Sequence, residues 1–207
     1  MNAKYGCRWA VALCGAVILI AVFWSQRCCG QEGTERPKKV LTPEQLAYQQ
    51  QWKEFMDKHH RLQAQGKAVF DAEMAREKAG DCPNARSNAD FINCFGDQLT
   101  ITDGNLKTFE GIIQALQAPG PQMPGQAEVT GDVPGIAGPA LTPQHFIEEF
   151  ERVEKIWGEY RETACTAAFH QFDGGTGGPS FEGQCELKLT RDHMRELDMI
   201  YGEDLHL

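Results

Sequence analysis

The chain has 207 residues, with 29 acidic side chains against 20 lysines and arginines, so its formal charge is −9 at neutral pH. This length suits one modest domain with extensions. An acidic chain is not expected to bind nucleic acid or an anionic lipid surface through electrostatics, whereas a basic protein partner would be favoured. Acidic charge is also common in soluble proteins that have no such partner.

Residues 1–30 are predicted to be an export signal. Lys4 and Arg8 make the start of the chain positive, and the apolar run at 9–24 is shorter than the about 20 apolar residues that a membrane span needs. The mature protein is therefore expected in the periplasm or outside the cell. The alternative is a short uncleaved anchor, which would attach the protein to a membrane through residues 9–24.

Cleavage before Gln31 would place the small residues Cys28 and Gly30 where signal peptidase recognises them. It would leave four cysteines in the chain: Cys82, Cys94, Cys165 and Cys185. In an exported protein they predict two disulfides, and no pair has the C-x-x-C spacing of a zinc or thioredoxin-type motif. Cleavage also removes three basic residues and no acid, so 20 basic side chains become 17 against 29 acidic ones, a formal charge of −12.

Helical periodicity starts after Thr42-Pro43, an N-cap followed by proline at the first helical position. A stripe of mediocre quality then runs to about Lys78: Tyr48, Trp52, Phe55, His59, Leu62, Val69 and Glu73. We expect a long, partly exposed helix that could bend near Gly66. Residues 31–80 are thus assigned to an amphipathic helical extension.

A second helix is predicted to start at a capping box formed by Ser87 and Asp90. Its stripe steps by three or four residues throughout, as in a core helix that faces a partner: Phe91, Phe95, Leu99, Thr102, Leu106, Phe109, Ile113 and Leu116. Residues 118–140 hold five prolines and five glycines, and they are expected to form a flexible linker.

Thr142-Pro143 repeats the N-cap and proline signal, and a third helix follows. Its expected inward stripe is Phe146, Phe150, Val153, Trp157, Tyr160, Ala164 and Ala168. A last helix is predicted from near Cys185 to Tyr201, with these residues inward: Leu189, Met194, Leu197 and Ile200 or Tyr201. The predicted fold class is all-α, a small antiparallel helical hairpin or bundle with two disulfides, plus the N-terminal helical extension.

The sequence contains no recognisable catalytic, metal-ligand or cofactor motif, so we expect that the protein is not an enzyme. The glycine-rich stretch Gly174–Gly178 lacks the lysine of a P-loop and the serine of a hydrolase elbow. His59 and His60 point about 100° apart on a helix and do not form a ligand pair. The single histidines His170 and His193 are expected on polar helix surfaces.

Several short motifs follow one another in a fixed order: Cys82-x11-Cys94, Asp103-x2-Leu106, Trp157-x2-Tyr160-Arg161-x3-Cys165, Gly174-Gly175-Thr176, and Cys185-x4-Thr190-Arg191 with Leu197. In this order they resemble the lysozyme inhibitor LprI-like N-terminal domain family, formerly a domain of unknown function. The resemblance covers about residues 80–201, so residues 81–207 are taken as the LprI-like helical domain. It implies an exported, α-helical, disulfide-bonded domain, and the family's name implies inhibition of lysozyme. The motifs identify no inhibitory contact residues.

Two disulfide pairings remain open. We favour Cys82–Cys94 with Cys165–Cys185, because the chain can fold back before the second helix and can turn at the glycine-rich loop. The alternative joins Cys94 to Cys165 and Cys82 to Cys185, since an antiparallel hairpin places the start of one helix beside the end of the other.

Two functions are compatible with these observations. The first is a secreted inhibitor or binding module directed at a basic cell-wall hydrolase such as lysozyme, which the acidic charge would attract. The second is a structural or envelope-adapter module without a hydrolase target, which would bind another envelope protein through the helix at 43–78.

Overall fold

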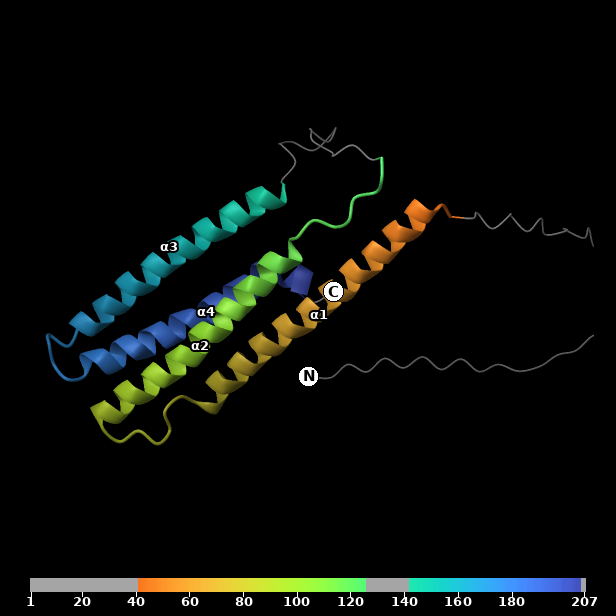
Figure 1. Cartoon of the computed structure of the whole chain (residues 1–207). Helices are drawn as coiled ribbons and strands as arrows, with labels where there is room; N and C mark the ends of the chain where they lie inside the picture. The colour runs from red at the N-terminus through yellow and green to blue at the C-terminus, as the bar shows by residue number, and fades with distance from the viewer. Residues whose placement is uncertain (1–40, 126–141, 206–207) are drawn as a thin grey trace, which may run out of the picture. The chain divides into compact units, whose positions relative to one another are not determined.

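Figure 1 shows the computed structural model of the protein, which describes residues 41–125 and 142–205. The described residues belong to one compact unit and form four α-helices: α1 (Pro43–Ala79), α2 (Asn88–Leu116), α3 (Pro143–His170) and α4 (Gly178–Leu205). These described residues contain no β-strand, so the predicted all-α fold class is confirmed. The predicted signal at 1–30 and most of the predicted linker lie outside them.

Three of the helices begin where the sequence predicts. The Thr42 hydroxyl accepts a hydrogen bond from the Gln45 amide at 3.2 Å, and the Gln45 side chain accepts one from the Thr42 amide at 3.0 Å. Ser87 and Asp90 form the same reciprocal box at the start of α2, and the Thr142 hydroxyl caps α3. Each cap satisfies backbone N–H groups that have no partner inside the helix, which fixes where the helix starts.

The core lies where α2 packs against α1 and α4, while α3 packs mainly against α4 (Figure 1). The stripe predicted for α2 faces this core, and Phe109 and Ile113 are at most 1% exposed. The main buried cluster consists of Leu106, Phe109, Ile112, Ile113, Leu116, Phe150, Met194, Leu197 and Leu205. A smaller cluster of Cys82, Phe95 and Leu187 lies beside the first disulfide.

The predicted helix at the N-terminal side of the domain is continuous through Gly66. Gly66 is buried, and a Cβ atom there would lie 2.9 Å from Leu205 Cδ2 and 3.3 Å from Ile112 Cγ2. The absent side chain therefore allows α1 to approach both α2 and the end of α4. Before Gly66, α1 contains no buried residue.

The inward face of α3 differs from the predicted stripe. Val153 is 43% exposed and Tyr160 is 58% exposed, so both point away from the bundle. Glu154 and Arg161 lie inward in their place, and both find partners on other helices. The prediction was wrong at these positions because it followed apolar residues, whereas polar pairs make part of this interface.

The last helix also differs from its prediction. It begins at Gly178, well before Cys185, and continues to Leu205. Ile200 is 57% exposed, whereas Tyr201 packs against the main core cluster. Because α4 is longer than predicted, Leu205 packs beside Gly66 of α1 and belongs to the main core cluster.

Both favoured disulfides are present. Cys82–Cys94 joins the turn after α1 to α2, and Cys165–Cys185 joins α3 to α4, with Cα–Cα distances of 5.8 and 5.4 Å. Cys82 has a φ of 54°, a left-handed conformation that turns the chain back before α2 begins. Two disulfides indicate that the protein folds in an oxidising environment.

The turn between α3 and α4 requires glycine. Gly174 has a φ of +76°, and a Cβ on Gly175 would lie 2.9 Å from the carbonyl oxygen of Phe172. The Thr176 hydroxyl accepts a hydrogen bond of 3.0 Å from the Asn88 side chain at the start of α2. This bond joins the turn between α3 and α4 to the start of α2, at the end of the bundle where the turn after α1 also lies (Figure 1).

The described start of the predicted linker has no helix or strand, yet it contacts α1. A Cβ on Gly120 would lie 3.0 Å from the ring of Trp52 and 3.6 Å from that of Phe55.

None of the described helices combines the length and the apolar character that a membrane span requires.

Candidate functional site

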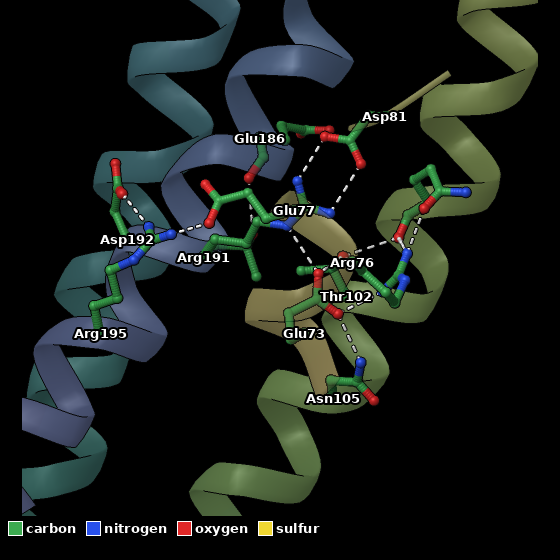
Figure 2. A network of polar contacts seen from close by, with 12 residues as sticks. Glu73, Arg76, Glu77, Asp81, Thr102, Asn105, Glu186, Arg191, Asp192 and Arg195 are labelled. Atoms are coloured by element: carbon green, nitrogen blue, oxygen red, sulfur yellow. Dashed lines mark hydrogen bonds and ion pairs between the residues drawn. The ribbon is translucent and has the colours of Figure 1, made fainter. Parts of the chain in front are cut away.

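A buried ion network joins α1, α4 and the turn after α1 (Figure 2). Arg191 is 2% exposed, and its Nε donates a hydrogen bond of 2.8 Å to Oε1 of the fully buried Glu73. The two terminal nitrogens of Arg191 donate to the two carboxylate oxygens of Asp81, at 2.6 and 2.9 Å. This bidentate pairing satisfies a guanidinium that could not otherwise be buried.

Glu73 is held by donors from α2 as well. Thr102 Oγ1 donates to it at 2.8 Å, Asn105 Nδ2 donates at 2.7 Å, and Arg76 on α1 forms an ion pair with it. Burial raises the pKa of Glu73, but the hydrogen bonds from Arg191, Asn105 and Thr102 outweigh it and leave the pKa lowered. The carboxylate is therefore charged and fully partnered, which makes this network a structural frame.

A second cluster brings together residues of the sequence motifs. Arg161 on α3 donates a hydrogen bond of 2.7 Å to Asp103 on α2 and one of 2.9 Å to the Thr190 hydroxyl on α4. Its guanidinium also lies 5.0 Å from the ring centroid of Trp157. Arg161 therefore links α3 to both α2 and α4, and its guanidinium lies over the ring of Trp157.

The motif residues are divided among four places. Trp157, Arg161 and Thr190 form this cluster, whereas Arg191 belongs to the buried network. Gly174 and Gly175 form the turn beside the second disulfide, and Tyr160 lies on the outer surface of α3.

A third group of residues, Glu110, Glu154 and His193, was not expected from the sequence. His193 is 3% exposed, so its predicted place on a polar surface is wrong. The ring of Trp157 stacks on it, with centroids 4.1 Å apart and planes 10° apart. Its Nε2 lies 2.9 and 3.1 Å from the two carboxylate oxygens of Glu154, and its Nδ1 lies 3.4 Å from Glu196.

Glu110 completes this group from α2. Burial and the neighbouring Glu154 carboxylate raise the pKa of Glu110 to about 7, although His193 and Arg161 act in the opposite direction. The signal in the sequence was a charged residue on an apolar stripe, since Glu154 lies one turn after Phe150. The partners could not be found, because each residue stands on a different helix.

The outer face of α3 forms a partly apolar surface. Ile156 is 60% exposed, and with Val153 and Tyr160 it makes a row along the helix. The same helix exposes five glutamates and two basic residues: Glu148, Glu149, Glu151, Glu159, Glu162, Arg152 and Lys155. We call this apolar row and the charged residues around it the α3 surface. It combines exposed apolar side chains with an excess of acidic over basic residues.

The sequence is similar to that of another known protein. An uncharacterised protein of Rhizobium meliloti (strain 1021) is 27% identical over 124 residues, which cover 59% of this chain and 80% of that protein. No family model matches the sequence, and no solved structure matches it.

Proposed function

We propose that the protein is an exported, disulfide-stabilised binding module that inhibits a basic cell-wall hydrolase of the lysozyme type and is not itself an enzyme. The observation that supports this most directly is the α3 surface, where Ile156 and Tyr160 are 60% and 58% exposed beside five glutamates. Exposed aromatic and aliphatic side chains are typical anchors of protein interfaces. A surrounding acidic excess would direct them to a cationic partner.

The charge of the whole chain supports the same partner. After removal of residues 1–30, the formal charge falls from −9 to −12 because only basic residues are lost. Such a charge accelerates association with a cationic enzyme at low salt, and the effect declines as salt screens it. The two disulfides are compatible with work outside the cytosol.

An activity assay tests this proposal. Purified, oxidised residues 31–207 are mixed with a panel of lysozymes of different types, and cell-wall lysis is followed at low and at high salt. We expect inhibition of at least one type, with slower association at high salt. A folded protein that inhibits no lysozyme in the panel would overturn the proposal.

Matched variants then test the surface. Ile156→Ala with Tyr160→Ala should weaken inhibition about tenfold or more, because interface anchors contribute over 1 kcal/mol each. Ile101→Ala is the control, since Ile101 is 48% exposed on α2. Equal inhibition by all these variants would show that the partner binds elsewhere.

The adapter function remains a second candidate, favoured by one observation on α1. The N-terminal half of α1 has no buried residue. It carries a row of aromatic rings in edge-to-face contact, in which the ring centroids of Tyr48 and Phe55 lie 6.3 and 5.3 Å from that of Trp52. A photo-crosslinker at the exposed Gln49 should then give one discrete adduct with an envelope protein in intact cells. Absence of an adduct, together with inhibition of lysozyme, would exclude this function.

A further inference from the structure

We propose that Glu110, Glu154 and His193 form a binding site for one divalent first-row transition metal ion, for which Zn²⁺ is the probe. Each residue offers one ligand atom, and these atoms all lie within 4.8 Å of one another. The ligands come from α2, α3 and α4, so the ion would link three helices.

The spacing of the ligand atoms fits such an ion. Ligands at about 2.0–2.2 Å from a tetrahedral Zn²⁺ stand about 3.4 Å apart. His193 Nε2 already lies 2.9 and 3.1 Å from the oxygens of Glu154, close to this separation. Glu110 is half-buried, and its carboxylate offers the third ligand atom within 4.8 Å of the other two.

The orientation of His193 is that of a metal ligand. Its Nε2 faces the Glu154 carboxylate at 2.9 Å and its Nδ1 faces the Glu196 carboxylate at 3.4 Å, and a carboxylate beside the second ring nitrogen is the usual partner of a metal-bound histidine. The stacked ring of Trp157 holds the imidazole plane in this position.

The charge balance also favours a divalent ion. One divalent cation would balance the two negative charges that Glu110 and Glu154 carry when both are ionised. The nearby cation, Arg161, is engaged by Asp103 at 2.7 Å and by Thr190 at 2.9 Å. Three protein ligands leave one coordination position for water. The 2-carboxylate, 1-imidazole set suits Zn²⁺ and its neighbours better than Ca²⁺, which takes only oxygen ligands.

The test uses the oxidised protein, purified without an affinity tag from cells that express the full chain and treated with a chelator. Calorimetric titration with Zn²⁺ should show one site, and Zn²⁺ in excess should raise the midpoint of thermal unfolding by several degrees. Co²⁺ should give visible absorption bands that report nitrogen and oxygen ligands.

Variants assign the site. His193→Gln and the isosteric Glu110→Gln should each weaken Zn²⁺ binding about tenfold or more, and Glu110→Gln serves if the first variant does not fold. The control is His145→Gln, because His145 pairs with Glu149 at 3.6 Å on the exposed part of α3. Absence of Zn²⁺ binding, or binding that only His145→Gln removes, would overturn the proposal.

Discussion

Arg191 illustrates how a charged side chain can be buried where helices meet. Each of its three side-chain nitrogens donates to a carboxylate, which belongs either to Glu73 within α1 or to Asp81 in the turn that follows (Figure 2). The sequence motif indicated that Arg191 matters. Its partners lie 118 and 110 residues away, and no local pattern connects positions at that separation.

Replacement of Arg191 by methionine should be strongly destabilising. The change leaves Glu73 buried without its main counter-charge, a situation that costs about 3–5 kcal/mol. Urea denaturation of the oxidised variant measures the loss.

The control for Arg191 is Lys188→Met on the same helix. Lys188 forms an ion pair with Asp192, but its side chain is 70% exposed. An exposed pair contributes at most about 1 kcal/mol. Equal losses for the two variants would show that burial does not govern these ion pairs.

At the scale of the helix, α2 could be predicted from its sequence and α3 only in part. Every buried residue of α2 is apolar except Thr102, so periodicity alone locates its buried face. On α3 the inward positions include Glu154 and Arg161, whose side chains are satisfied by other helices. Apolar periodicity cannot identify such positions, because their partners appear only when the helices are assembled.

Gly66 sets the distance between α1 and its neighbours. Gly66→Leu should destabilise the protein by about 1–3 kcal/mol, because the new side chain would collide with Leu205 and Ile112. Thermal unfolding compares it with Gly111→Ala. Gly111 also lies within a helix, but a Cβ there has nothing within 4 Å.

Gly111→Ala should therefore stabilise the protein by up to about 1 kcal/mol, through helix propensity alone. The same sign for both variants would contradict a close approach at Gly66.

At the scale of the molecule, the class of fold could be predicted, and the observed cysteine pairing is the favoured one of two that the sequence left open, whereas the packing of α1 could not be predicted. The turns next to Pro83 and Gly174 already allowed each cysteine to reach its sequence neighbour. The stripe predicted for α1 includes Glu73, and the burial of this carboxylate is explained only by its hydrogen bond from Arg191 on α4. The cluster of Glu110, Glu154 and His193 depends on the same assembly.

The disulfides should contribute similar amounts to stability. Replacing Cys165 and Cys185 by serine should cost about 2–4 kcal/mol, and the same change at Cys82 and Cys94 should differ by less than about 1 kcal/mol. The reason is that loop entropy depends weakly on length, and the sequence separations are 20 and 12. Chemical denaturation of both double variants checks this, and a much larger difference would point to strain or packing at one bridge.

The pairing of each cysteine with the next one along the chain has a consequence for biogenesis. If the chain is exported with its N-terminus first, as proposed, Cys94 meets only Cys82 among these four cysteines when it enters the oxidising compartment, and Cys165 and Cys185 follow much later. An oxidase that joins thiols in their order of arrival therefore produces the native bonds directly. Maturation of this protein should be independent of a disulfide isomerase, unlike that of proteins whose bonds cross.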